Sequence, residues 1–288
     1  MDWRKKTVEI SDKSVINRLY NDFGHCDSAH AFQSIFIWKD DMRLSFYLGK
    51  NLYSAHIGDE DDRIWFFPVG DEESKRSFIG RLIEEGKTAF YYLTEDDVSF
   101  LTENFPERFE ITGAPDDSEY LFDREAMEFL RGSVFAKKRN QVKRFLKEHE
   151  VVTKPVVFDD KSVIKNIITA WDRARHPGGV TDHKATLNML ENMEVLGLEG
   201  VLLYLDGAPF AVIAGYAISE DTVDCCLQKA KENMQGLSFY LRQQFAASFP
   251  PDIRTFNWEE DLGLPGLRRS KEIMHPVGKI DMYKAVLR

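Results

Sequence analysis

Strands and helices alternate along this chain in two successive passages, and this order constrains the fold more than any other feature. In the first passage, residues 43–57 predict two strands joined by a turn, and a helix over 72–85 lies between two further strands. In the second, a helix that ends near Arg173 precedes three strands within 201–228, and another helix follows over 237–249. Each passage contains hairpins as well as strand–helix alternation. The sequence therefore predicts a mixed-sheet α/β fold rather than a doubly wound parallel sheet.

Length and charge narrow the setting. The 288 residues are enough for about two domains, and the net charge of −10 argues against binding a polyanion with the whole surface. Two of the three cysteines, Cys225 and Cys226, are neighbours that would rarely pair, which favours a reducing cytoplasm. The beginning of the sequence does not resemble a signal peptide, and no apolar run approaches the roughly 20 residues needed to span a bilayer. We therefore expect a soluble, cytoplasmic protein without a transmembrane segment.

The first candidate site is a polar cluster near the end of the chain. Asn257, Glu259 and Asp261 alternate with other residues, and on a strand this period of two would place all three on one face. Arg268 and Lys271 follow a turn rich in Gly and Pro. A carboxylate of Glu259 or Asp261 could act as a base, and the two cations could hold a phosphate, a carboxylate or an oxyanion. The alternative is a surface salt-bridge network around the turn.

A second candidate lies at a strand–helix junction, made of Gln235, Gly236, Leu237 and Ser238. Free backbone N–H groups at a helix N-terminus suit a phosphate or pyrophosphate, and glycine lets a ligand approach the backbone closely. The alternative is an ordinary junction in which Gly236 only makes the turn. A single glycine favours that alternative.

A third candidate is a basic helix. It carries a run of cations without an intervening acidic residue: Lys137, Lys138, Arg139, Lys143, Arg144 and Lys147. Such a concentration of charge could receive a phosphate-rich ligand such as tRNA or CoA. The alternative is a solvated helix face that is balanced by nearby acidic loops.

Several other site classes are disfavoured. The sequence contains no Gly-x-Ser-x-Gly elbow, Walker A loop or Gly-x-Gly-x-x-Gly fingerprint, which argues against hydrolase, kinase and dehydrogenase functions. The group of His25, Cys26 and His30 does not match a zinc-ligand pattern, and the pair of His176 and His183 lacks further ligands. We therefore predict no metal site.

Two segments resemble a known family. They are Glu119–Phe145, which contains the basic helix, and the ending N-W-E-E-D-L-G-L-P-G-L-R-R-S-K with Pro276 and Tyr283 downstream. Both resemble a family of bacterial proteins related to the C-terminal domain of phosphatidylglycerol lysyltransferases. The resemblance implies tandem GNAT-type acyltransferase domains of the Fem kind, each with a mixed central sheet flanked by helices. We expect an N-terminal domain over residues 1–130 and a C-terminal domain with the active cleft over 131–288.

The resemblance also implies a type of reaction. Lysyltransferases of this kind move an aminoacyl group from aminoacyl-tRNA to a lipid hydroxyl, Fem-type enzymes move one to a peptidoglycan amine, and other GNAT relatives use acyl-CoA. This chain lacks the membrane-spanning region of the full-length lipid enzymes. The resemblance implies an acyltransferase without a tightly bound cofactor, with acyl-CoA or aminoacyl-tRNA as co-substrate. Its acceptor would be a small molecule, a peptide or a lipid headgroup.

The family motifs indicate which residues would form the site. The terminal motif implies cleft positions for Asn257, Glu259, Asp261, Arg268 and Lys271. In GNAT domains the strand–helix junction binds the donor's pyrophosphate, which adds weight to residues 235–238, although this motif lacks its second small residue. Lys138, Arg139 and Asn140 match the basic motif without an assigned role. Two other functions remain open, a non-catalytic module that binds RNA or a phosphorylated partner, and a small-molecule N-acetyltransferase.

Overall fold

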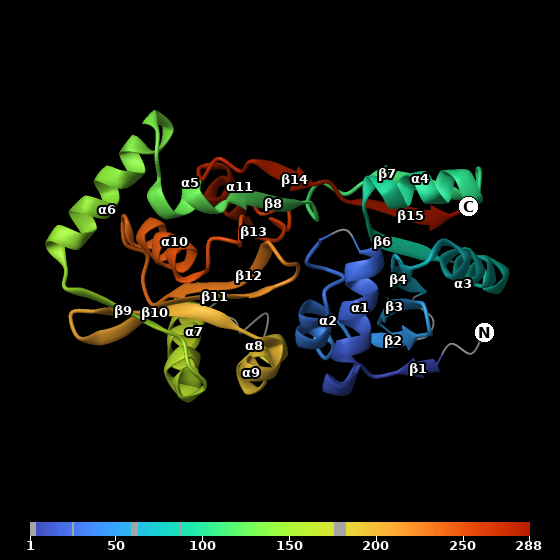
Figure 1. Ribbon diagram of the computed structural model, residues 1–288, viewed down its shortest axis with the longest axis horizontal. Helices are drawn as coiled ribbons and strands as arrows, with labels where there is room; N and C mark the ends of the chain where they lie inside the picture. The colour runs from blue at the N-terminus through green and yellow to red at the C-terminus, as the bar shows by residue number, and fades with distance from the viewer. Residues whose placement is uncertain (1–3, 25, 59–62, 87, 176–182) are drawn as a thin grey trace.

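The computed structural model describes residues 4–24, 26–58, 63–86, 88–175 and 183–288, and its strands form two sheets (Figure 1). The expected loop at 176–179 and the side chains of His25, His176 and His183 lie outside what it describes. The first sheet contains β1 (Arg4–Lys6), β2 (Ser45–Leu48), β3 (Leu52–Ile57), β4 (Ile64–Phe66), β5 (Val69–Gly70), β6 (Ala89–Leu93), β7 (Phe109–Gly113) and β15 (Tyr283–Leu287). The second contains β8 (Glu119–Asp123), β9 (Val151–Pro155), β10 (Glu199–Leu205), β11 (Ala208–Ala217), β12 (Thr222–Ala230), β13 (Thr255–Asn257) and β14 (Gly278–Ile280).

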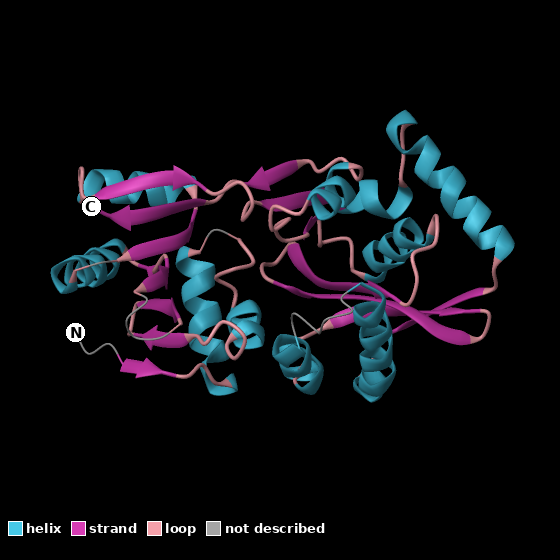
Figure 2. Ribbon diagram, turned by 180° about the vertical axis from the view of Figure 1, so that it is seen from behind, coloured by secondary structure: helices cyan, strands magenta, loops and turns pink. Residues whose placement is uncertain are grey.

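Helices flank both sheets (Figure 2). The α-helices are α1 (Lys13–Phe23), α2 (Phe32–Trp38), α3 (Glu72–Glu85), α4 (Glu95–Asn104), α5 (Arg124–Phe129), α6 (Ala136–Glu148), α7 (Lys161–Arg175), α8 (His183–Glu191), α9 (Met193–Leu196), α10 (Leu237–Ser248) and α11 (Pro265–Glu272). Short 3₁₀ turns occur at Ile10–Asp12, Ser133–Phe135 and Phe158–Asp160.

Each sheet is mixed, and each contains one parallel pair of strands among the described residues. The first sheet runs in the order β1-β2-β3-β4-β6-β15-β7, with β5 beside β3, and its parallel pair is β4 and β6. The second runs β14-β8-β13-β12-β11-β10-β9, with β12 and β13 parallel. Helices α3 and α10 provide the crossovers between the paired strands. The predicted mixed α/β fold with two sheets flanked by helices is confirmed.

The last strand of the chain returns to the first sheet. Strand β8 is the first strand of the second sheet in sequence and pairs with β13 and β14, while the last strand, β15, returns to the first sheet between β6 and β7. Sheet membership therefore does not follow chain order. The expected division between residues 130 and 131 stays a prediction, because strand pairing does not define units that fold independently.

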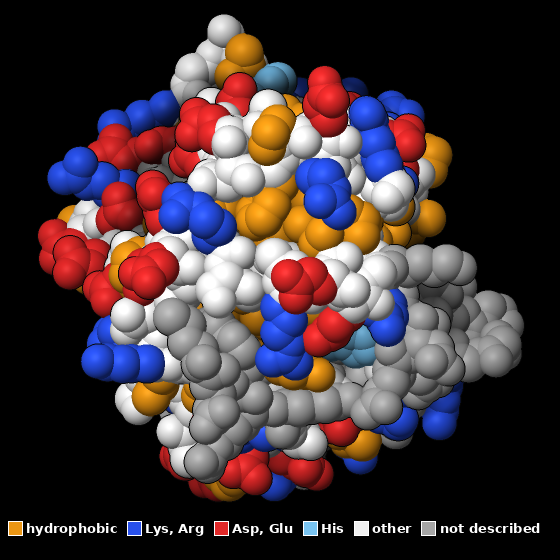
Figure 3. Space-filling view, turned by 90° about the vertical axis from the view of Figure 1, so that its right-hand side faces the viewer, with side chains coloured by type: hydrophobic (Ala, Val, Ile, Leu, Met, Phe, Trp, Pro, Cys, Tyr) orange, Lys and Arg blue, Asp and Glu red, His pale blue; other side chains and the backbone are white. Residues whose placement is uncertain are grey.

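Three apolar cores follow from the alternation of side chains on the strands. On β10, Leu202 joins a core with α7 and α8, while Val201 and Leu203 face the opposite core with α5, α6 and α10. The core that holds Leu202 also contains Phe36 of α2 and Phe46 of β2, so it joins the two halves of the molecule. A third core lies under α3 and α4. Figure 3 shows the end of the molecule formed by the first sheet, where basic and acidic side chains intermingle around exposed apolar ones.

Capping residues close in sequence define the ends of α3 and the start of α4. Asp71 accepts a hydrogen bond of 2.7 Å from the Ser74 N–H at the start of α3, and Gly86, with φ of 93°, follows its last residue. Thr94 forms a capping box with Asp97 at the start of α4. Helices α1 and α2, in contrast, were not predicted from the sequence.

Candidate functional site

A cleft opens where two parallel strands of the second sheet separate. Strands β12 and β13 pair only from Thr222 with Thr255 to Asp224 with Asn257. Beyond that point β12 continues to Ala230, while the chain after Asn257 turns away. The cleft has a volume of about 1820 Å³, and it is lined by the end of β12, the start of α10, the segment 258–271 and side chains of α2 and α8.

The segment after β13 is not the extended strand that the sequence predicts. The strand ends at Asn257, and Glu259 has a φ of +53°, which breaks the period of two. The Trp258 N–H donates to the Tyr120 carbonyl at 2.9 Å, and the Tyr120 N–H donates to the Glu259 carbonyl at 3.1 Å. Lys271 Nζ donates to the carbonyls of Trp258 and Glu260. These contacts with Tyr120 and Lys271 interrupt the alternation expected from the sequence, and the three polar side chains do not share one strand face.

Of the five terminal residues predicted to form the site, Glu259 and Lys271 line the cleft. Asn257 is fully buried behind it, where its Nδ2 donates to the Glu119 carboxylate and its Oδ1 accepts from the Glu259 N–H at 2.9 Å. Asn257 thus holds the main chain of Glu259 against β8. Asn257 therefore supports the wall of the cleft and does not face its interior.

Asp261 and Arg268 also lie outside the cleft lining. Asp261 is 0 % exposed and accepts hydrogen bonds from the Tyr120 hydroxyl (2.5 Å), the Gly263 N–H (3.0 Å) and Arg268 (2.8 Å to each oxygen). Arg268 also donates to Asp116 at 2.7 Å. The hydrogen bonds from Arg268 lower the pKa of Asp261 to about 2. A carboxylate so well satisfied is a weak base, and the geometry favours Glu259 over Asp261 for that role.

Buried carboxylates gather on one side of the cleft. Burial raises the pKa of Glu259 well above its ordinary value, and the nearby Asp224 and Glu260 raise it further. Burial likewise raises the pKa of Asp224 to about 7 and that of Glu119 to about 8. Lys271 is 3 % exposed, and burial lowers its pKa against the opposing effect of Glu259 and Glu260. This side of the cleft carries more carboxylates than cations.

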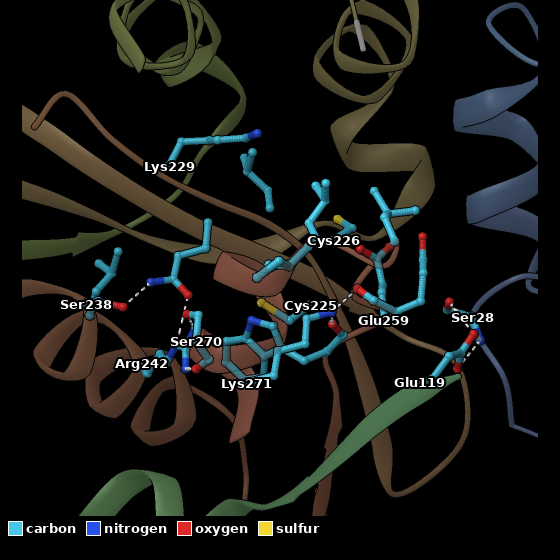
Figure 4. A pocket seen from close by; sticks show the side chains of 18 of the residues that line it. Ser28, Glu119, Cys225, Cys226, Lys229, Ser238, Arg242, Glu259, Ser270 and Lys271 are labelled. Carbon is cyan, nitrogen blue, oxygen red and sulfur yellow. Dashed lines mark hydrogen bonds between the residues drawn. The ribbon is translucent and has the colours of Figure 1, made fainter. Parts of the chain in front are cut away.

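The opposite side holds polar and cationic groups (Figure 4). Gln228 of β12 donates from Nε2 to the Ser238 hydroxyl at 2.8 Å, and its Oε1 accepts from Arg242 Nε at 2.9 Å. Arg242 and Ser270 also line the cleft. Figure 4 shows Ser238, Arg242 and Ser270 together, with Glu119 and Ser28 at the other side of the view. Charge is thus separated along the cleft.

The predicted strand–helix junction also lines the cleft, from Gln235 through Gly236 and Leu237 to Ser238. Gly236 has a φ of +95°, and a Cβ there would lie 2.4 Å from the carbonyl oxygen of Gln141 in α6. The glycine is therefore required by its backbone conformation and by close packing on α6. Binding of a donor phosphate at this junction stays a prediction.

The basic helix α6 divides its cations between three environments. Lys137 and Lys138 line the cleft. Arg139 donates to the carbonyls of Leu130 and Gly132 just beyond α5, while Arg144 pairs with Glu148 at 2.8 Å and Lys143 is exposed. Lys147 is also exposed, so only Lys137 and Lys138 of the six predicted basic residues are placed to meet a ligand in the cleft.

Sequence reasoning missed several residues of the site. Arg242 could have been found, because it lies on the buried stripe of α10 with Leu241 and Phe245. A cation on an apolar helix face signals an unusual environment. Asp224 lies within a predicted strand and Glu119 lies in β8, and neither residue carries a comparable signal. Among the described residues, no group of three His, Cys, Asp or Glu side chains is arranged to hold a metal, and no helix is long and apolar enough to cross a membrane.

Comparison with solved structures supports the fold. A conserved protein of unknown function from Bacteroides thetaiotaomicron VPI-5482 has a TM-score of 0.91 and 23% identity over 100% of both chains. The C-terminal domain (DUF2156) of a putative lysylphosphatidylglycerol synthetase from Agrobacterium fabrum has a TM-score of 0.66 and 18% identity over 96% of this chain and 93% of that chain. FemX has a TM-score of 0.60 and 8% identity over 96% of each chain. These similarities support the mixed α/β fold, which this chain shares with FemX.

Sequence comparison identifies the family. Among curated proteins, none matches this chain significantly. The family model described as phosphatidylglycerol lysyltransferase, C-terminal, matches residues 20–286. The match includes both segments that carry the resemblance, and it covers the second sheet and all of the first sheet except β1 and the last residue of β15. The chain therefore belongs to the family of phosphatidylglycerol lysyltransferase C-terminal domains.

Proposed function

We propose that this protein is an acyltransferase that moves an aminoacyl group from an aminoacyl-tRNA to an amine or hydroxyl acceptor. Membership of the family supports acyltransferase chemistry. The observation that carries the proposal is the position of Glu259, a half-buried carboxylate with a raised pKa in the cleft where β12 and β13 separate. A carboxylate with a raised pKa is a stronger base than an ordinary one, and general-base catalysis requires such a group.

The reaction would proceed by direct transfer. The Glu259 carboxylate accepts a proton from the acceptor amine or hydroxyl, whose nitrogen or oxygen then attacks the ester carbonyl carbon of the donor. The bond from that carbon to the ribose oxygen breaks, and the released oxygen takes up a proton. Lys271 moderates the charge of the carboxylate cluster around Glu259. Most of the rate enhancement would come from positioning the two substrates in the cleft.

The charge of the cleft favours an aminoacyl donor over a simple acyl donor. An aminoacyl group carries an ammonium, which would stabilise the ionised forms of Glu259 and Glu260 in the cleft lining, whereas an acetyl group carries no charge. Lys137 and Lys138 line the same cleft and suit the phosphate backbone of tRNA. The same fold occurs in FemX and in a putative lysylphosphatidylglycerol synthetase, whose name describes the transfer of a lysyl group.

The acceptor is proposed only by chemical class, as the amine or hydroxyl of a small molecule, a peptide or a lipid headgroup. A cytoplasmic location also forms part of the proposal. Its support is that all three cysteines are free thiols in the structure, as a reducing compartment would keep them.

The proposal is tested with bulk tRNA charged with labelled amino acids, with a small amine or glycerol supplied as the acceptor. We expect protein-dependent transfer of the label, and loss of that transfer in Glu259→Gln. Glu272→Gln, an exposed substitution on α11, is the matched control and should behave as the wild type. Transfer that is equal in Glu259→Gln and the wild type would refute the role of Glu259.

Two other outcomes would point to other functions. Label transferred only from acetyl-CoA would favour a small-molecule N-acetyltransferase. Salt-dependent binding of tRNA through Lys137 and Lys138, without transfer to any acceptor, would favour a non-catalytic module that binds RNA or a phosphorylated partner.

A further inference from the structure

The cleft contains a buried cation that the proposed chemistry does not use. Arg242 projects from α10 and is 6 % exposed, yet it lines the cleft. Its guanidinium lies over the Trp258 ring, with 4.9 Å between the guanidinium carbon and the ring centre. The side chain is therefore held in place on one side by an aromatic ring, and its remaining contacts are polar.

No carboxylate among the described residues forms an ion pair with Arg242. Burial lowers the pKa of Arg242 to about 10, and the partly opposing effect comes from the Cys225 thiol rather than from an Asp or Glu. Lys271 lies close enough for the charge of Arg242 to lower the pKa of that lysine. A buried charge without an opposite partner is costly, and two neighbouring cations increase the cost. A bound anion would remove it.

The hydrogen bonds of Arg242 leave donors available. Its Nε donates to Gln228 at 2.9 Å, which is an ordinary length. Its two terminal nitrogens reach only the carbonyl and hydroxyl of Ser270, at 3.4 and 3.5 Å. These contacts are long enough to be replaced by shorter bonds to an anion. The hydroxyl oxygen of Ser270 accepts from Arg242, so its own proton is free to be donated.

Ser238 adds a third donor to this group. Its hydroxyl oxygen accepts from Gln228 Nε2 at 2.8 Å, so the hydroxyl proton can be donated elsewhere. Gln228 thus connects Ser238 to Arg242, and Figure 4 shows Ser238, Arg242 and Ser270 gathered on one side of the cleft. A guanidinium fork with two hydroxyl donors suits a tetrahedral oxyanion better than a flat carboxylate, which has only two oxygens.

We propose that Arg242, Ser238 and Ser270 form a subsite for a phosphate group of a substrate. Phosphate bound there would lie on the opposite side of the cleft from the carboxylates that would attract the ammonium of an aminoacyl group (Figure 4). The inference deepens the proposed function, and it rests on that function only for the identity of the molecule that carries the phosphate. The phosphate would belong either to the terminal nucleotide of the donor or to a phosphorylated acceptor.

Binding is measured with three probes, which are inorganic phosphate, AMP and glycerol 3-phosphate. The readouts are the shift of the thermal midpoint and the change in tryptophan emission, since Trp258 stacks on Arg242. We expect all three probes to bind the wild type. Tighter binding of AMP would assign the phosphate to the nucleotide donor, and tighter binding of glycerol 3-phosphate would assign it to the acceptor. The emission change should disappear in Trp258→Phe.

Substitutions then test the residues. Arg242→Met should weaken phosphate binding at least tenfold, Ser270→Ala should weaken it less, and Arg242→Lys should retain part of it. Arg144→Met, on the exposed face of α6, is the matched control and should bind as the wild type does. If Arg242→Met does not fold, phosphate binding by Arg242→Lys and Ser270→Ala still tests the subsite. Unchanged binding in these variants, or no saturable binding of any probe to the wild type, would overturn the subsite.

The two proposals fail separately. Phosphate binding that depends on Arg242, together with no aminoacyl transfer to any acceptor, would overturn the proposed function and leave the subsite. Aminoacyl transfer that depends on Glu259 but is equal in Arg242→Met and the wild type would overturn the subsite and leave the function.

Discussion

Arg268 binds the carboxylate of Asp261 with two donors, Nε and Nη2, each 2.8 Å from an oxygen. The Gly263 N–H donates to the same carboxylate at 3.0 Å, so the pair also fixes the turn that follows the cleft segment. Two exposed residues of that turn, Leu262 and Leu264, line the cleft. The ion pair therefore shapes the cleft wall from behind, although neither of its members lines the cleft.

The Asp261–Arg268 pair should make the stability of the protein depend on acid. The pKa of Asp261 falls from its ordinary value of 3.8 to about 2 on folding, so the pair stabilises the folded state above pH 4 and loses this effect as the pH falls toward 2. Allowing for the partial exposure of Arg268, Asp261→Asn should lower the free energy of unfolding by about 1–2 kcal/mol at pH 7. Urea denaturation at pH 7 and near pH 2 measures the difference.

Asp116→Asn is the control for this effect. Asp116 is 60 % exposed in its side chain and bonds the same arginine, so its loss should cost little. An effect of Asp261→Asn that is equally large at pH 7 and near pH 2 would contradict the acid linkage.

Glu259→Gln should slow transfer by roughly 10²–10⁴-fold, the usual contribution of a general base. The pKa of Glu259 is raised by burial and by Asp224 and Glu260, and a base works only when it has lost its proton. The wild-type rate should therefore rise with pH over a range above that of ordinary carboxylates. Single-turnover rates across this range should show that rise in the wild type and in Glu272→Gln. They should show a flat profile in Glu259→Gln, and a rise that persists there would assign the titration to another group.

The sequence predicted best what depends on near neighbours. Helix α3 could be bounded from Asp71 and Gly86 because a cap and a left-handed stop act within one turn of the chain. The cleft segment could not be predicted in this way. Its conformation depends on Tyr120, more than a hundred residues earlier, and on the ammonium of Lys271, whose hydrogen bonds to two main-chain carbonyls interrupt the alternation.

The candidate site shows the same limit. Residue type and family motif predicted Glu259, Asp261 and Arg268 as site residues. They did not predict which of the two carboxylates would face the cleft. That depends on the positive φ of Glu259 and on the hydrogen bond between Asn257 and Glu119 of the neighbouring strand. Both features involve pairing with β8, a strand more than a hundred residues earlier in the chain, which no local pattern indicates.

Lys137 and Lys138 should contribute to tRNA binding because both line the cleft. The double change Lys137→Ala/Lys138→Ala should weaken binding most at low salt and reduce the slope of log affinity against log salt by about one to two units. The control is Lys143→Ala/Arg144→Ala, which removes the same formal charge from exposed positions of α6 outside the cleft lining. Filter binding of tRNA between 50 and 200 mM salt compares the two double variants. Contacts with phosphates typically lose affinity in this range. Equal slopes for both double variants would show that binding follows total charge rather than the cleft.

Gly236 and Gly266 provide a matched pair at the starts of two helices, α10 and α11. Gly236 has a φ of +95°, and an added Cβ would lie 2.4 Å from the Gln141 carbonyl, whereas a Cβ at Gly266 would meet nothing within 4 Å. Gly236→Ala should therefore lower the free energy of unfolding by about 2 kcal/mol or more, through backbone strain and displacement of α6. Gly266→Ala should be neutral or stabilising by up to about 1 kcal/mol. Because α6 carries Lys137 and Lys138, Gly236→Ala should also weaken tRNA binding. Denaturation and binding measured on the same samples test both effects, and a fully stable Gly236→Ala protein would show that α6 does not pack on this junction.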